Sequence, residues 1–191
     1  MTDKKSRVIS IRCRLHQCQQ QQPRPVIYAG GESEAAKNLI AERCDTYVMH
    51  GDPPPRIREK IADMRTRREK LNLPPMQYGI AAYAIIRDTE EEAKAELARI
   101  TDVKASAAGY DNYQQWLSGT KLEGQMSIQE YSVSNRGLRP GLVGTPDQVA
   151  ERIDEFEDAG VDLLLLQCSP QFEEMERFAA EVIRKPTARR V

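Results

Sequence analysis

A turn of two glycines, a glutamate and a serine is the segment of this sequence best suited to bind an anion. Gly30, Gly31, Glu32 and Ser33 follow a short apolar run, Val26–Ala29, and precede a stretch with helical spacing. Glycine lets the backbone approach a ligand closely, and the first turn of a helix offers unpaired N–H groups and a partial positive charge. The turn is therefore a candidate phosphate site. The same residues also fit a plain tight turn in which Ser33 only caps the helix.

Other reactive residue types carry weaker signals. Tyr83, inside an apolar run, could donate a hydrogen bond to a ligand, but a tyrosine on a buried strand also fits a core position with a satisfied hydroxyl. Cys13, His16 and Cys18 lie within six residues and lack a fourth ligand, which does not match zinc spacing, so no metal site is expected. The arginines between 56 and 68 alternate with acidic residues and indicate a solvated helix face.

The elements that must position these residues alternate between apolar strands and amphipathic helices. The predicted strands cover 26–29, 46–49, 78–86 and 161–166, the last as a fully buried strand. Capping patterns place helix starts at Ser33, at Thr89 with Glu92, and at Thr145 with Gln148. Gly160 ends the helix that begins at Pro146. Such alternation predicts an α/β fold with parallel strands and right-handed crossovers.

The chain of 191 residues is short for a closed (β/α)8 barrel, which typically needs about 250. We expect a partial TIM barrel of about the last four βα units, occupying residues 24–191. An inserted helical and loop segment, Ser106–Leu142, precedes the last strand, and its end, 132–144, is expected to form a lid. Residues 1–23 contain a glutamine run and are expected to form a disordered or non-homologous tail.

Taken together, the motifs of the chain resemble the C-terminal half of the luciferase-like flavin-dependent monooxygenases. The resemblance covers roughly Arg24 to Ile183 and is closest to the dimethyl sulfone and alkanesulfonate monooxygenases. The motifs that carry it, in order, are Pro25–Ser33, Cys44–Tyr47, Gly51–Pro54, Ile86–Ala93, Leu142–Pro146 and Gly160–Asp162.

The resemblance implies a cofactor, a co-substrate and a partner. Such enzymes bind reduced FMN (FMNH2) at the barrel mouth, use O2 as co-substrate and oxygenate a small molecule. A separate NAD(P)H-dependent FMN reductase supplies the reduced flavin. Gly30, Gly31, Glu32 and Ser33 match the turn that holds the FMN phosphate in the family.

The resemblance also assigns residues to the substrate pocket. His50 stands where the alkanesulfonate enzymes place an aromatic pocket residue, and Ser169 where they carry a tyrosine. Ala81 and Tyr83 replace an arginine and a histidine of those enzymes, which favours a neutral substrate such as dimethyl sulfone over an anionic sulfonate.

Two arginines complete the residues assigned by resemblance. Arg136 and Arg139 lie where related enzymes carry an arginine on a loop that closes over the flavin. There a guanidinium could stabilise a developing anion and help to exclude water. Two solvated loop arginines are the other interpretation. Tyr83, Arg136 and Arg139 are thus the candidate catalytic residues.

Two hypotheses about function follow. The first is an FMNH2-dependent monooxygenase of small organosulfur compounds, of which this chain is a truncated copy with doubtful activity of its own. The second is a catalytically silent flavin-binding or assembly module. The formal net charge of −1, from 28 basic and 29 acidic residues, argues against nucleic acid and anionic membranes as partners. A cytoplasmic protein is expected. Four strands cannot close a barrel and leave open edges, so a homo-oligomer is expected too.

Overall fold

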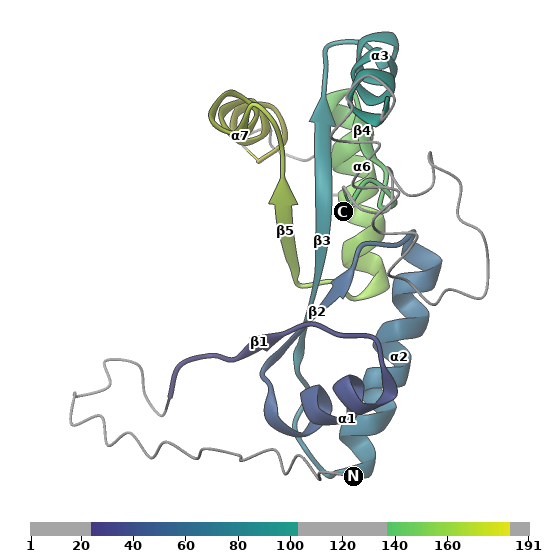
Figure 1. Ribbon diagram of the computed structural model, residues 1–191, viewed down its shortest axis with the longest axis vertical. Coiled ribbons are helices and arrows are strands. Elements are labelled where there is room, and N and C mark those ends of the chain that lie inside the picture. Colours follow the sequence, from purple (N-terminus) through teal and green to yellow (C-terminus); the bar gives the residue numbers. More distant parts are fainter. Residues whose placement is uncertain (1–23, 103–136, 184–191) are drawn as a thin grey trace, which may run out of the picture.

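A computed structural model of the protein describes residues 24–102 and 137–183 (Figure 1). The helices are α1 (Glu34–Arg43), α2 (Pro54–Lys70), α3 (Glu90–Thr101), α6 (Pro146–Ala159) and α7 (Gln171–Phe178), which continues into the π-helical turn η2 (Ala179–Ile183). The strands are β1 (Tyr28–Ala29), β2 (Thr46–His50), β3 (Gln77–Ile86), β4 (Leu142–Gly144) and β5 (Leu163–Gln167). The predicted tail 1–23 and most of the predicted insertion lie outside the described residues.

All strand pairs in the sheet are parallel, and β3 is its central strand (Figure 1). On one side β3 pairs with β2, which in turn pairs with β1. Its residues 79–83 also pair with β5, in register Gly79↔Leu163 to Tyr83↔Gln167. This arrangement of parallel strands and crossover helices confirms the predicted α/β partial barrel.

The strand β4 was not predicted. It pairs with the carboxyl end of β3, in register Ala84↔Leu142 to Ile86↔Gly144. Its three residues lie in the stretch predicted to form a lid. A strand of three residues among glycines and polar residues gives too short an apolar pattern to be predicted. The last residues of the predicted lid are therefore part of the sheet.

The hydrophobic core lies between one face of the sheet and helices α1, α2 and α6. Alternate residues of β3, such as Ile80 and Ile86, point to this side and contact residues such as Ile57 of α2 and Phe156 of α6. All four of these side chains are buried. Burying such side chains is the main source of stability for parallel βα units.

The opposite face of the sheet is called the inner face here; it includes Val48, His50, Gly79, Ala81, Leu163 and Leu165. Both leucines are exposed, Leu163 by 38% and Leu165 by 55%. The prediction of a fully buried strand at 161–166 is therefore wrong, because only Val161, Leu164 and Leu166 of this stretch pack in or against the core. A run of four leucines gives no sign of which face is covered.

Helix ends follow the capping chemistry expected from the sequence. The hydroxyl of Ser33 accepts a hydrogen bond from the Ala36 N–H at 3.2 Å. Thr89 with Glu92, and Thr145 with Gln148, form reciprocal capping boxes. Gly160 ends α6 with a left-handed φ of 97°. These predictions are confirmed.

Replacing Thr145 with alanine is expected to lower the free energy of unfolding by about 1 kcal/mol, because the Gln148 N–H loses its acceptor. Urea denaturation would measure the change. Thr66→Ala is the matched control: its hydroxyl only bonds back to the Ala62 carbonyl within α2. We expect that change to be neutral within about 0.5 kcal/mol, and equal losses for both variants would contradict a capping role.

Candidate functional site

The Gly30–Ser33 turn lies at the carboxyl end of β1 and leads directly into α1. A Cβ atom at Gly30 would come within 2.8 Å of the Val48 carbonyl oxygen, and one at Gly31 within 2.8 Å of the Ala36 Cβ. Gly31 also has a φ of 154°. Both positions therefore need glycine. The Ala36 N–H is taken by the Ser33 hydroxyl, whereas a helix start in general offers further N–H groups that suit a phosphate.

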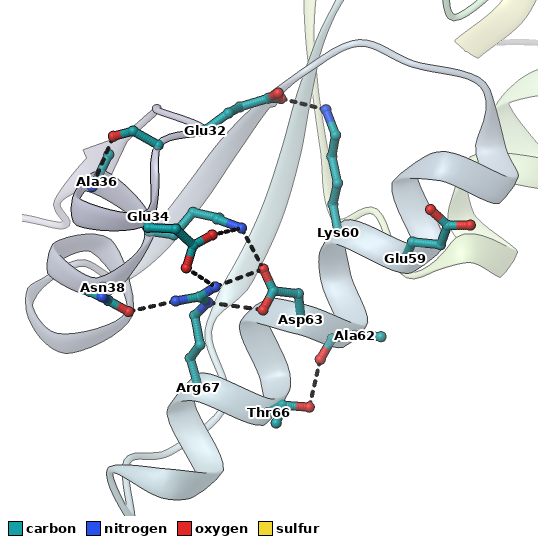
Figure 2. Close-up of polar contacts among 12 residues, drawn as sticks. Glu32, Glu34, Ala36, Asn38, Glu59, Lys60, Ala62, Asp63, Thr66 and Arg67 are labelled. Atoms are coloured by element: carbon teal, nitrogen blue, oxygen red, sulfur yellow. Dashed lines mark hydrogen bonds and ion pairs between the residues drawn. The ribbon is translucent and has the colours of Figure 1, made fainter.

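Two glutamates near the turn would oppose an anion unless they were neutralised, and both are paired (Figure 2). Glu32 forms an ion pair with Lys60 of α2. Glu34 pairs with Lys37 at 2.6 Å and with Arg67 at 2.8 Å. Hydrogen bonds from these two cations hold the pKa of the Glu34 carboxyl below its usual value. The local charge is thus largely balanced, and the turn remains compatible with a phosphate.

A tyrosine of β2 fixes the position of the turn. The Tyr47 hydroxyl donates a hydrogen bond to the Gly31 carbonyl oxygen at 3.1 Å. Burial raises the pKa of this phenol, so it stays protonated and can donate. The turn is therefore anchored to the neighbouring strand as well as to α1.

The predicted pocket residues of β2 and β3 lie side by side. His50, the last residue of β2, is in register with Ala81 of β3, and Ala81 is in register with Leu165 of β5. Residues in register on parallel strands project from the same face. His50 is exposed, and Ala81 is small, so this part of the inner face is open.

Tyr83 lies two residues further along β3, in register with Gln167. Its side chain is buried in a cluster with Leu138, Ile85 and two residues of α3. The core interpretation of this tyrosine is therefore supported by its packing, although its position next to Ala81 also places it at the edge of the open region.

Arg139 is already paired with a carboxylate. Its guanidinium lies 2.9 Å from Asp52, which directly follows β2 and also pairs with Lys60 at 2.7 Å. Gly51 allows this approach, since a Cβ there would meet Pro140 at 2.4 Å and the Ala81 carbonyl oxygen at 2.2 Å. The segment before β4 is thus held against the end of β2. A ligand anion at Arg139 would have to compete with this carboxylate for the charge of the guanidinium.

Of the remaining predicted site residues, the structure describes only Ser169. Ser169 is exposed, two residues beyond the end of β5. Arg136 lies outside the described residues. Cys13, His16 and Cys18, which were not expected to bind a metal, do too. Within residues 24–102 and 137–183 no three His, Cys, Asp or Glu side chains are grouped to bind a metal.

The sequence analysis missed Asp52 and Lys60 as site residues. Together they connect the Glu32 turn to Arg139 through a chain of ion pairs. The only sequence signal was the position of Asp52 directly after a strand. Nothing local identified Lys60, because its partners lie on two other loops.

We expect Asp52→Asn to lower the free energy of unfolding by about 2 kcal/mol, because the buried Asp52 carboxylate balances Arg139 and Lys60. The control is Glu59→Gln, which breaks an exposed ion pair with Arg56 and should cost about 0.5 kcal/mol or less. Urea denaturation of both variants tests the difference. If Asp52→Asn leaves the free energy of unfolding unchanged, the ion pairs of Asp52 do not stabilise the fold.

Two cavities among the described residues lie away from these strand ends. One, of about 280 Å³, is apolar and lies between β3, β5 and α7, lined by residues such as Ile86, Leu166 and Phe178. The other, of about 430 Å³, lies between α3, α6 and β4. Neither of these two cavities includes the Gly30–Ser33 turn or His50.

The fold belongs to the class of parallel βα units, with a two-glycine turn at the carboxyl end of β1. Residues 7–163 match the sequence profile described as luciferase-like monooxygenase. The chain belongs to this luciferase-like monooxygenase family.

Solved structures share the fold of the chain. One is long-chain alkane monooxygenase (LadA), with a TM-score of 0.65 and 23% identity over 84% of this chain and 40% of that one. A second is EDTA monooxygenase (EmoA) from Chelativorans sp. BNC1, with a TM-score of 0.67 and 19% identity over 94% and 48%. A third is the oxygenating constituent of 3,6-diketocamphane monooxygenase from Pseudomonas putida in complex with FMN, with a TM-score of 0.52 and 17% identity over 83% and 48%.

The chain spans less than half the length of each of these three structures. Among residues 24–102 and 137–183, no helix combines the length and the apolar character needed to cross a bilayer.

Proposed function

We propose that the chain forms the FMN-binding half of a reduced-FMN-dependent monooxygenase. The observation that carries the proposal is the Gly30–Ser33 turn, anchored by Tyr47 and opening onto the start of α1, in a chain of the luciferase-like family. A structural neighbour in complex with FMN supports the choice of cofactor. The protein would act in the cytoplasm with a separate NAD(P)H-dependent FMN reductase.

The backbone N–H groups of Gly31, Glu32 and Ser33 would hold the FMN phosphate at the start of α1. Bound reduced FMN supplies electrons to O2, of which one atom goes to the substrate and the other to water. His50 and Ala81, which are in register on β2 and β3, would line the substrate side of the site, and Tyr83 would stand at its edge. Arg139, once released from Asp52, would provide a cation for developing negative charge.

The substrate we propose is a small neutral organosulfur compound such as dimethyl sulfone. The strand residues of the inner face include no lysine or arginine, and the Arg139 guanidinium beside them is already paired with Asp52, so a sulfonate would have no unpaired cation as its counter-charge. His50 and Tyr83 instead offer hydrogen-bond donors, which suit sulfone oxygens. Ser169 adds a further hydroxyl beyond β5.

Titration with FMN and with riboflavin tests the cofactor site. We expect FMN to bind about tenfold or more tightly than riboflavin, because only FMN carries the phosphate that the turn accepts. Turnover is tested with an FMN reductase, NADH, O2 and dimethyl sulfone, by following loss of the sulfone. Equal affinity for both flavins would reject the phosphate site, whereas phosphate-dependent binding without turnover would favour the second candidate.

That second candidate is a catalytically silent flavin-binding or assembly module. The exposure of Leu163 and Leu165 favours it, because among the described residues this part of the inner face is open to water. Oxygenation needs exclusion of water, whereas binding of the FMN phosphate at the turn does not.

A further inference from the structure

Exposed apolar side chains gather on the two outermost strands of the sheet. Val26, Ile27 and Tyr28, in and beside β1, are 50%, 43% and 55% exposed. At the other side, Leu163 and Leu165 of β5 are 38% and 55% exposed. β1 pairs only with β2 among the described strands, and β5 only with β3. Both edges thus carry exposed apolar side chains, and no strand among the described residues pairs with their outer sides.

The open edges also present backbone groups. The Ile27 carbonyl oxygen accepts from the Asp45 and Thr46 N–H groups at the start of β2. Because backbone groups alternate between the two sides of a strand, those of Val26 and Tyr28 point away from β2. Likewise the Asp162 N–H donates to Tyr78 of β3, so the backbone groups of Leu163 and Leu165 point to the open side. Unpaired edges of this kind recruit another strand.

We propose that a second copy of this chain covers the inner face, with β1 of each copy pairing with β5 of the other. The proposal rests on the fold and does not depend on the proposed function.

Strand number and direction favour a second copy. β1, β2, β3 and β5 lie side by side and run parallel, so a two-fold axis along the strands brings both edges into parallel register at once. Two copies supply eight strands, the number that closes a barrel whose interior side chains can fill. The two seams are identical by symmetry, so the assembly closes at the dimer.

Charge and size also suit this partner. The residues that would meet at each seam, around Tyr28 and Leu165, are apolar, so no like charges are brought together. The formal net charge of −1 per chain adds little repulsion between copies. Gly79 and Ala81 leave the centre of the inner face shallow, which makes room for leucines from the opposite side.

Sedimentation equilibrium of the protein without flavin tests the proposal. We expect twice the 21.7 kDa mass of the chain. In the variant Leu165→Asp, a charge is placed in both seams, and the dissociation constant of the dimer should rise about 100-fold. The matched control is Leu39→Asp, which changes a leucine that is 60% exposed but belongs to helix α1 and to neither edge strand; the mass should stay doubled.

Hydrogen exchange of the unmodified protein gives a readout that does not depend on how the variants fold. In the dimer, the Tyr28, Leu163 and Leu165 amides should exchange at least about 100-fold more slowly than free amides. A monomeric mass overturns the proposal, whether or not these amides are protected. Protection in a monomer would mean that other parts of the same chain cover the edges. An open series of larger species, or a dimer that Leu39→Asp breaks and Leu165→Asp leaves intact, overturns it as well.

Discussion

Replacing Arg68 with alanine is expected to lower the free energy of unfolding by about 3–5 kcal/mol, which is a large fraction of the stability of a domain. The Arg68 side chain is 8% exposed and donates to the carbonyl oxygens of Pro74 at 2.6 and 2.9 Å, Ala41 at 2.9 Å and Cys44 at 3.3 Å. Its removal leaves buried carbonyl groups unpaired and opens a cavity between α1 and the end of α2. Urea or thermal denaturation measures the loss.

The neighbouring Arg67 provides the control. Its guanidinium pairs with Glu34 at 2.8 Å and with Asp63 at 2.9 Å, at the surface between α1 and α2 (Figure 2). Such pairs contribute little, so Arg67→Ala should cost about 1 kcal/mol or less. If Arg68→Ala costs no more than Arg67→Ala, the four carbonyl contacts do not stabilise the fold.

Arg68 also shows the limit of what the sequence predicts. The alternation of arginines with acidic residues indicated a solvated helix face, and this holds for Arg56, which pairs with Glu59 at the surface. Arg68 belongs to the same stretch but is buried, because its acceptors lie at the end of α1 and in the loop after α2. Those partners are brought together only by the packing of two helices, so local composition could not identify them. The interpretation of Arg68 as solvated was wrong.

Features fixed by a few neighbouring residues were predicted correctly. The capping box of Thr145 with Gln148 spans four residues, and Gly160 adopts the left-handed conformation that ends α6. The parallel strands were predicted for a related reason, since apolar runs between amphipathic helices have few other solutions. In contrast, the exposure of Leu165 depends on what covers the inner face, which no local pattern records.

The candidate site shows the same contrast between features set by neighbouring residues and features set by residues far apart in sequence. The Gly30–Ser33 turn was predicted because a strand, two glycines and a capping serine are adjacent in sequence. The ion pairs of Asp52 with Lys60 and Arg139 were not, since the Arg139 partner is far along the chain and charged residues are common on surfaces. The roles of Tyr83, His50 and Ser169 in substrate binding remain predictions.

Gly31→Ala is expected to have the largest effect on flavin binding. A methyl group at Gly31 would lie 2.8 Å from the Ala36 Cβ, which is held by the α1 backbone and has no flexible end to move aside. The positive φ of 154° adds strain for any residue with a Cβ. The turn must therefore shift away from the start of α1. Loss of two or three charge-assisted hydrogen bonds from N–H groups to a phosphate should weaken FMN binding about 100-fold.

Two comparisons, FMN with riboflavin and Gly31→Ala with a second glycine variant, separate loss of phosphate binding from a general loss of folding. Riboflavin lacks the phosphate, so its affinity should be the same for Gly31→Ala and the unmodified protein, and the preference for FMN should disappear. Gly79→Ala is the matched control, because an added Cβ there meets only Leu163 atoms at 3.4 Å, an ordinary contact distance. That variant should keep the preference for FMN, as fluorescence titration would show. If Gly31→Ala binds both flavins as the unmodified protein does, the phosphate lies elsewhere and the turn is only the start of a helix.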